Sequence, residues 1–404
     1  MGSLVGLVLL GAGLAFPAQL KKGPWVGALE LEAGMVVPFN FEVTGSPDKT
    51  VLTIRNAEEK IRVDEVAVRG DSLTFRMPIF DSEFKVRIQG DSLAGRWFNH
   101  AKSDSLGAPF KAWFNRTDRF GLKADKGETA FRGKWEVTFS PGSRDSYRAV
   151  GVFSQKPGYV RGTFLTETGD FRFLEGTQSQ NRLYLSCFDG AHAYLFRAKL
   201  DGVGILEGDF YAYPSHHEKW LGVRNARFSL RDPDSITHLK KQFEGISFTF
   251  PDLEGRPVSL SDARFKDKVV IVQVMGSWCP NCMDETAYLS RFYRRFHPKG
   301  LEIIALAYER ASDPARARDN VLRLKKRLAA EYVFLLTGLS GKSKASESLP
   351  ALDTISAFPT TIYLDKRGKV RKVHTGFSGP ATGREYARFR QTDESFVAGL
   401  LREP

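Results

Sequence analysis

The sequence contains little cysteine: three residues in 404, and two of them, Cys279 and Cys282, are separated by only two positions. So small a number excludes a framework of structural disulfides of the kind that stabilises small secreted domains. The third, Cys187, lies in the apolar stretch 183–188. A lone cysteine in such a stretch is expected to pack as a small buried side chain.

Long apolar runs are also missing. No segment beyond residue 19 approaches 18 consecutive apolar residues, so no stable membrane span is expected. Residues 1–19 combine a short apolar run with small residues, although no basic residue precedes Lys21. This pattern is typical of a secretory signal peptide, and a buried first strand is the alternative. We therefore expect an exported, extracytoplasmic protein, with the periplasm as its compartment.

Basic clusters are missing too, although the formal net charge is +12. The longest basic runs are Arg294-Arg295 and 325–327, and acidic residues are interspersed with the other lysines and arginines. A nucleic-acid-binding surface would gather its positive charge in one stripe, so no nucleic-acid partner is expected. The length predicts two or three domains.

Residues 20–230 are predicted to form an all-β region. Apolar and polar residues alternate in many short runs, such as 39–43, 84–88 and 193–198, with turn residues between them. This alternation is typical of antiparallel strands in a barrel or sandwich. Similar residues recur 110 positions later, as with Trp25 and Trp135 or Leu73 and Leu183. We interpret this as a duplicated meander over 25–130 and 133–230, either two small domains or two halves of one larger barrel.

A different pattern follows a predicted linker at 231–242. Residues 269–274 and 301–307 are apolar runs typical of strands covered on both faces, and 283–296 has the spacing of an amphipathic helix. A charged helix is expected from Pro314 to about Tyr332, a hairpin over 360–365 and 370–373, and a final helix over 395–401. Alternating strands and helices predict an α/β domain over 243–404.

The sequence Trp278-Cys-Pro-Asn-Cys282 stands where a predicted strand meets a predicted helix. Attack on a disulfide needs a thiolate, and the N–H groups and dipole of a helix start favour the anion of Cys279. Cys282, about one turn further on, can resolve the mixed disulfide. Zinc would need two more ligands, but no second cysteine pair exists and His297 and His374 are isolated. No metal or other cofactor is expected.

These residues resemble the TlpA/ResA-like branch of the thioredoxin family, the extracytoplasmic thiol–disulfide oxidoreductases. The likeness covers about 160 C-terminal residues and rests on the motifs 248–251, 259–261, 269–274, Trp278–Cys282, Glu285, 357–361 and 376–383. It implies a thioredoxin fold for this part of the chain and leaves residues 20–240 unexplained.

The resemblance also implies roles for single residues. Pro359 would be in a cis peptide and face the dithiol, while Trp278 and Phe358 would shape the substrate face. Glu285 would tune or relay the proton of Cys282, the alternative being a solvated residue of the first helical turn. Many thioredoxins have a buried Asp six residues before the first cysteine, and this chain has Gln273 there. Proton transfer would then depend on Glu285 or on water.

The predicted function is thiol–disulfide exchange, in the reducing direction, on extracytoplasmic protein disulfides. The expected partners are a disulfide-bonded protein and an electron donor that the sequence does not identify, and the oligomeric state stays open. The alternative is a ligand-binding or partner-binding β-region with an accessory thioredoxin domain. A thiol peroxidase is disfavoured because Val272 and Gly276 stand where peroxidatic cysteines are preceded by Pro and Thr.

Overall fold

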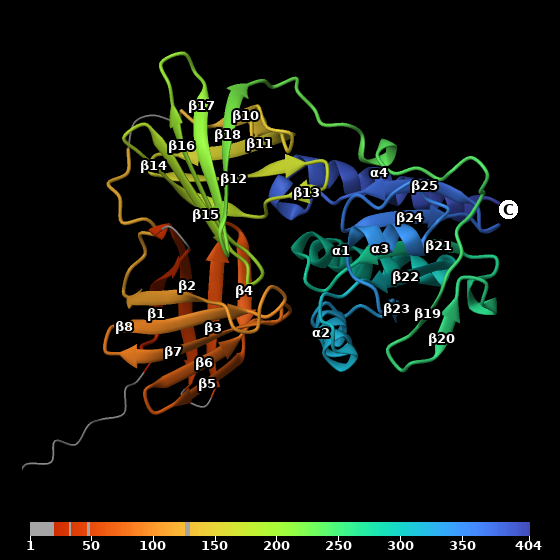
Figure 1. Cartoon of the computed structure of the whole chain (residues 1–404), viewed down its shortest axis with the longest axis horizontal. Coiled ribbons are helices and arrows are strands. Elements are labelled where there is room, and N and C mark those ends of the chain that lie inside the picture. The colour runs from red at the N-terminus through yellow and green to blue at the C-terminus, as the bar shows by residue number, and fades with distance from the viewer. Residues whose placement is uncertain (1–19, 32–33, 47–48, 126–129) are drawn as a thin grey trace, which may run out of the picture.

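The computed structural model describes residues 20–31, 34–46, 49–125 and 130–404, so the predicted signal peptide lies outside the described residues. The chain forms an all-β part and an α/β part that lie beside each other (Figure 1). The predicted fold class is confirmed. We call residues 20–230 the β-region and 243–404 the thioredoxin domain; these limits, and the linker 231–242, stay predictions.

The first half of the β-region is an open antiparallel sheet of nine strands. Its spatial order is β4-β3-β2-β1-β9-β8-β7-β6-β5, so β4 and β5 are its two edges. The strands are β1 (Gly23–Glu30), β2 (Val36–Ser46), β3 (Lys49–Asn56), β4 (Glu59–Val63), β5 (Glu65–Arg69), β6 (Ser72–Arg76), β7 (Ser82–Gln89), β8 (Ser92–Asn99) and β9 (Gly107–Phe114).

The second half is a closed barrel. Its order runs β11-β10-β18-β17-β16-β15-β14-β12-β13, and a further pairing of β11 with β12 joins the two ends. The strands are β10 (Gly133–Phe139), β11 (Tyr147–Lys156), β12 (Tyr159–Thr166), β13 (Gly169–Asp170), β14 (Leu174–Ser179), β15 (Arg182–Phe188), β16 (Ala193–Leu200), β17 (Leu206–Ala212) and β18 (His216–Arg224).

Equivalent residues of the two halves make equivalent contacts. The indole Nε1 of Trp25 donates to the carbonyl of Lys21 at 3.0 Å, and that of Trp135 donates to the carbonyl of Phe131 at 2.9 Å. Both tryptophans are fully buried in the first strand of their sheet. The duplicated meander predicted from the sequence accounts for this repetition.

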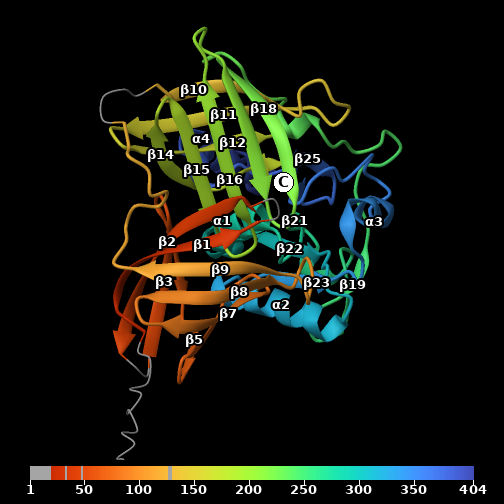
Figure 2. The ribbon, with the colours of Figure 1, turned by 60° about the vertical axis from the view of Figure 1, so that its left-hand side comes forward.

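Phe188, at the end of β15, joins the two halves. Its ring lies 4.5 Å from that of Phe39, 5.5 Å from Phe84 and 5.2 Å from Trp97, all in the first sheet. Because these are aromatic contacts inside one apolar cluster, the barrel contributes a side chain to the core of the open sheet. The two sheets therefore stack as one β-rich body (Figure 2).

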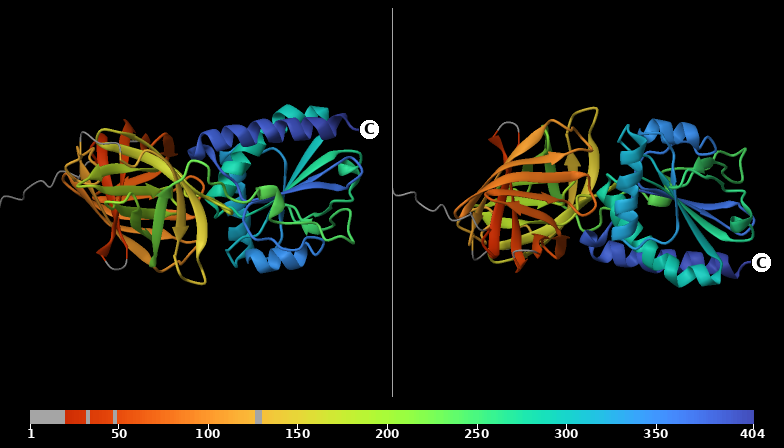
Figure 3. Two further views of the ribbon diagram at one scale, coloured as in Figure 1. Left: turned by 90° about the horizontal axis from the view of Figure 1, so that it is seen from above. Right: turned by 90° about the horizontal axis from the view of Figure 1, so that it is seen from below.

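The thioredoxin domain is a five-stranded mixed sheet in the order β23-β22-β21-β24-β25. One apolar cluster joins α1 and α4 to one face, and another joins α3 to the opposite face (Figure 3). The elements are β19 (Thr249–Pro251), β20 (Pro257–Ser259), β21 (Val269–Met275), α1 (Pro280–Phe296), β22 (Leu301–Ala307), α2 (Pro314–Arg327), β23 (Val333–Leu336), α3 (Gly341–Ser348), β24 (Thr360–Leu364), β25 (Val370–Thr375) and α4 (Arg384–Arg402).

Two helices differ from their predicted limits. Helix α1 begins at Pro280, three residues before the predicted start, because Cys279 caps it and proline suits the first turn. Helix α4 begins eleven residues before the predicted 395. The prediction missed its first part because only Asp393, Val397 and Leu400 are buried along the helix, so its sequence shows little apolar periodicity. Among the described residues, no helix has both the length and the apolar character needed to cross a membrane.

Candidate active site

Cys279 lies at the N-terminal end of α1, where the buried strand β21 turns into the helix. Its backbone is extended, and its Sγ accepts a hydrogen bond from the Cys282 N–H at 3.3 Å. This N–H belongs to the first helical turn, where backbone donors have no partner within the helix. The position therefore stabilises negative charge on the Cys279 sulfur.

Cys282 faces the interior. It is fully buried, whereas Cys279 retains 7% of its surface. Burial, followed by the neighbouring Cys279, holds the pKa of the Cys282 thiol well above its usual range. Cys279, Cys282 and Cys187 are free cysteines. Cys187 is fully buried in β15, which confirms the packing role predicted for it.

Pro359 lies beside the dithiol. The Phe358–Pro359 peptide is cis, as the resemblance implied, and the Cys279 thiol donates to the Phe358 carbonyl at 3.4 Å. The Phe358 ring meets the Trp278 ring edge-on, with centroids 5.5 Å apart. The structure therefore brings together five of the predicted residues: both cysteines, Pro359, Trp278 and Phe358.

Glu285, the sixth predicted residue, is buried with 1% of its surface exposed. Its carboxylate accepts from Thr361 Oγ1 at 2.6 Å and from Gln273 Nε2 at 2.8 Å. Burial raises the pKa of Glu285 to about 7 despite these two donors. It is therefore not the solvated helix residue of the alternative interpretation, and Gln273 is a donor to it.

Two further contacts fix the Trp278 ring. Its Nε1 donates to the carbonyl of Tyr308 at 3.0 Å, and the guanidinium of Arg310 lies 3.6 Å from the ring centroid. This is a cation–π geometry at the edge of the dithiol. The adjacent Ser277 donates from its backbone N–H and hydroxyl to Glu309, at 2.7 and 2.6 Å.

A short segment of the β-region lies against the start of α1. Asn281, between the two cysteines, donates from Nδ2 to the carbonyl of Asp170 at 3.3 Å. The Asp170 carboxylate accepts from the backbone N–H of Gly379, in the loop before α4. At Gly169 a side chain would collide with Asn281, because an added Cβ would lie 1.9 Å from its Nδ2. The β-region thus touches the dithiol motif itself.

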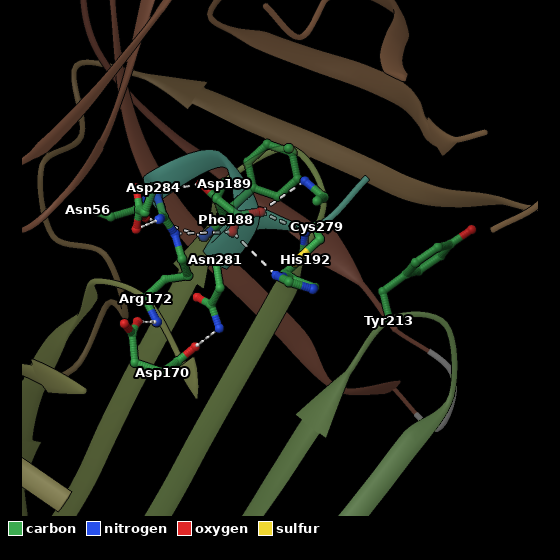
Figure 4. A network of polar contacts seen from close by, with 12 residues as sticks. Asn56, Asp170, Arg172, Phe188, Asp189, His192, Tyr213, Cys279, Asn281 and Asp284 are labelled. Atoms are coloured by element: carbon green, nitrogen blue, oxygen red, sulfur yellow. Dashed lines mark hydrogen bonds and ion pairs between the residues drawn. The ribbon is translucent and has the colours of Figure 1, made fainter. Parts of the chain in front are cut away.

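Arg172 extends this contact with buried charge. It is 1% exposed and forms ion pairs with Glu59 of the first sheet and Asp284 of α1, and its Nε lies 3.7 Å from Asp189 (Figure 4). Asp284 follows Cys282 by two residues. Burial raises the pKa of Asp284 to about 7 even with Arg172 beside it. One arginine therefore links both sheets of the β-region to the active-site helix.

The two parts of the chain enclose a cavity of about 970 Å³ that opens onto Cys279. Its thioredoxin-domain wall includes Trp278, Arg310 and Phe358, and its β-region wall includes Lys102 and a group of aromatic side chains. These aromatic residues are Phe171, Tyr194, Phe210 and Tyr213. Sequence reasoning missed Lys102, Asp170, Arg172 and Arg310, because no motif marks them.

The sheet order, the cysteine pair and the cis proline define the C-terminal part of the chain as a thioredoxin-like domain. The Redoxin family matches residues 241–387, so this part is a Redoxin domain. The thiol-disulfide oxidoreductase ResA of Geobacillus thermodenitrificans is 30% identical over 129 residues, which are 32% of this chain and 66% of that protein. ResA of Bacillus subtilis is 29% identical over 130 residues, 32% of this chain and 64% of that protein.

The chain therefore matches less than two thirds of the length of these relatives. Among solved structures, the thioredoxin domain of a thiol-disulfide oxidoreductase from Bacteroides vulgatus is 26% identical, with a TM-score of 0.30, and the match covers 40% of this chain and 99% of that one. A thioredoxin-family thiol:disulfide interchange protein from Chlorobium tepidum is 21% identical, with a TM-score of 0.29. That match covers 39% of this chain and 95% of that one.

Proposed function

We propose that the protein is an extracytoplasmic thiol–disulfide oxidoreductase that reduces protein disulfides with the Cys279–Cys282 pair. One observation carries the proposal: the Cys279 sulfur lies between the Cys282 N–H, which stabilises a thiolate, and the Phe358 carbonyl beside Pro359. The backbone next to Pro359 can align an extended substrate against the attacking sulfur.

In the first step, the Cys279 thiolate attacks one sulfur of the substrate disulfide. A bond forms between that sulfur and Cys279 Sγ, the substrate disulfide breaks, and one substrate cysteine leaves as a thiolate. The partly accessible Cys279 suits this attack, whereas the fully buried Cys282 does not. The mixed disulfide is therefore assigned to Cys279.

In the second step, Cys282 attacks Cys279 Sγ and displaces the second substrate thiolate. The Cys282 thiol must first lose its proton, which its burial opposes. We assign the proton acceptor to Glu285, buried in the same domain with a pKa of about 7. The substrate gains two electrons, the enzyme is left with a Cys279–Cys282 disulfide, and a separate thiol donor must reduce it again.

The proposed location depends on residues 1–19, whose composition is that of a secretory signal peptide. The cavity against Cys279 is lined by both parts of the chain, which favours a β-region that serves the dithiol over one with a separate binding function. In this proposal the substrate is one separate protein and the electron donor is another.

Cys279→Ser is expected to abolish the reduction of insulin disulfides, because serine cannot form the mixed disulfide. Cys282→Ser is expected to accumulate a mixed disulfide with substrate, visible on a non-reducing gel. Cys187→Ala removes a thiol away from the site and should retain full turnover. Persistent activity of the Cys279→Ser variant would refute the proposal.

The direction of exchange is tested by equilibrating the Cys279–Cys282 pair with defined thiol buffers while following Trp278 fluorescence. A reductant should have a potential near the roughly −270 mV of thioredoxin. A value near roughly −120 mV, that of a strong disulfide donor, would reverse the proposed direction.

A further inference from the structure

The cavity beside Cys279 restricts what can reach the attacking sulfur. A substrate disulfide must pass between Trp278 and Phe358 on one side and the β-region on the other. In the β-region wall, Phe171 and Tyr194 are partly exposed and offer apolar surface to an extended peptide, whereas Phe210 and Tyr213 are buried behind them. The charges on the two walls then decide which peptides fit.

Arg310 lies at the edge of the dithiol with an unused guanidinium. It stacks on the Trp278 ring at 3.6 Å, and within the described ranges it has no hydrogen-bond or ion-pair partner. Its side chain is exposed in the cavity wall. A guanidinium that is already held over an aromatic ring and keeps its N–H donors for other partners is suited to bind a carboxylate.

Lys102 lines the same cavity as Arg310, from the β-region wall. Its ammonium donates to the Tyr213 carbonyl and lies 5.7 Å from the centre of the Tyr213 ring. Burial, and after it repulsion by the positive charge of Arg310, lower the pKa of Lys102, and the negative charge of Asp189 offsets this only in part. A bound anion would relieve this repulsion, and Lys102 has donors left for it.

Two carboxylates act on these cations from a distance, Asp189 on Lys102 and Glu309 on Arg310, but among the described residues neither cation forms an ion pair with a carboxylate. Asp81 is paired with Arg76 and Arg316, and Asp170 accepts from two backbone N–H groups. Glu218 accepts from two hydroxyls, and Glu309 accepts from Ser277. Asp145 is exposed in the turn between β10 and β11. The lining carboxylates are thus engaged by other donors, and Lys102 and Arg310 keep N–H donors for a carboxylate that enters the cavity.

We propose that Lys102 and Arg310 bind a carboxylate adjacent to the disulfide of an extended peptide, so that the enzyme prefers disulfides with acidic neighbours. The inference rests on the proposed function, since it names the substrate class of the same dithiol. The β-region supplies one of the two cations, which gives it a direct part in specificity.

The test uses the full chain and three synthetic peptides that share one intramolecular disulfide and differ only in the flanking residue: Glu, Gln or Lys. The Glu peptide is expected to be reduced with a KM about tenfold below that of the Gln peptide, because it makes one additional charge-assisted contact. The Lys peptide is expected to have a KM above that of the Gln peptide. The preference should weaken as the salt concentration rises.

A second measurement needs no thiol chemistry. The same peptides with both cysteines replaced by serine are titrated against the native chain, with Trp278 fluorescence as the readout. The Glu peptide should bind about tenfold tighter than the Gln peptide. Arg310→Gln and Lys102→Gln should each remove most of this difference, while Lys111→Gln, an exposed lysine on β9 outside the cavity, should leave it unchanged.

Equal binding of the Glu and Gln peptides to the native chain would overturn the inference, and so would an undiminished preference in both variants. Failure of the proposed function gives a different result, because then no peptide disulfide is reduced whatever its flanking residue. The binding titration reports on the carboxylate site in either case.

Discussion

Three residues after Cys282, Glu285 lies with its carboxylate buried between β21 and β24. One hydroxyl donor, from Thr361, and one amide donor, from Gln273, partly replace the water that the carboxylate has lost. Burial therefore dominates, and the pKa rises to about 7. A carboxylic acid with this pKa can both accept and return a proton near neutral pH.

Glu285→Gln is expected to slow the resolving step and to remove its pH dependence near 7. In the native enzyme the rate of mixed-disulfide resolution should rise with pH as Glu285 ionises. In the variant Cys282 must lose its proton to water, so the rate should be lower above pH 7 by about ten- to a hundredfold, the lower part of the usual range for a positioned base. Stopped-flow Trp278 fluorescence between pH 5 and 9 measures this, with the exposed Glu207→Gln as control.

The same substitution has a stability consequence whose sign is set by linkage. Between the usual Glu value of 4.5 and about 7, the folded chain holds a proton on Glu285 that the unfolded chain has released. The free energy of unfolding therefore falls as pH rises through this window. Glu285→Gln should flatten that slope in urea titrations, and an unchanged slope would mean that Glu285 titrates normally.

The residues that sequence reasoning could predict all lie in short motifs. Cys279, Cys282 and Trp278 belong to one pentapeptide, and Phe358 and Pro359 belong to another. Arg310 and Lys102 lie 208 positions apart and become neighbours only when the β-region meets the thioredoxin domain. No local sequence pattern could reveal this pair, because each residue taken alone is indistinguishable from the other solvent-exposed lysines and arginines.

At the scale of elements, the most consequential contact joins β13 and the residues after it to α1. Arg172 follows β13, and it places its guanidinium among Glu59, Asp189 and Asp284. Three carboxylates around one cation in a buried place are tolerable only while the cation stays. This cluster therefore ties the position of α1, and so of the dithiol, to the β-region.

Arg172→Met should destabilise the chain strongly, because it leaves Glu59, Asp189 and Asp284 buried without their cation. The loss is expected to be about 3–5 kcal/mol, as for other broken buried ion pairs. Urea unfolding at pH 8 measures it, and the effect should shrink toward pH 5 as Asp284, with its pKa of about 7, takes up a proton. The exposed Arg69→Met is the matched control, and an equal loss in both variants would contradict the argument.

Element prediction succeeded where apolar residues repeat and failed where they are sparse. The predicted strand 301–307 coincides with β22. All its residues except Glu302 are buried, as expected for a strand that is covered on both faces of the sheet. Helix α4 was recognised only near its end, because Arg384–Gln391 is mostly charged or polar and only Tyr386 and Phe389 pack against the core there. The duplication was visible because Trp25 and Trp135 lie in equivalent strands. The closure of only the second sheet was not visible, because it needs β12 to pair with β11 as well as with β14 while β10 pairs with the distant β18.

At the scale of the whole molecule, helix α2 holds the thioredoxin domain against the open sheet of the β-region through charge. Arg316 pairs with Asp81 at 2.7 Å and with Asp104 at 2.9 Å. Further along the helix, Arg323 lies 3.6 Å from Glu65 and Arg327 lies 3.4 Å from Asp64. The hydrogen bonds from Arg316 and Arg76, with their charges, outweigh the burial of Asp81 and lower the pKa of its carboxyl. This row of pairs could not be predicted from either sequence segment alone.

Arg316→Glu is expected to separate the two parts of the chain, because it sets a third carboxylate against Asp81 and Asp104. Small-angle X-ray scattering should then give a larger radius of gyration at low salt, with partial recovery as salt screens the repulsion. Insulin reduction should persist, since the Cys279–Cys282 geometry is internal to the thioredoxin domain, while the preference for acidic peptides should fall as Lys102 moves away from Arg310. Lys326→Glu makes the same charge change at an exposed position of α2 and should alter neither property. If both variants expand equally, net charge and not the Arg316 pairing governs how the two parts are held together.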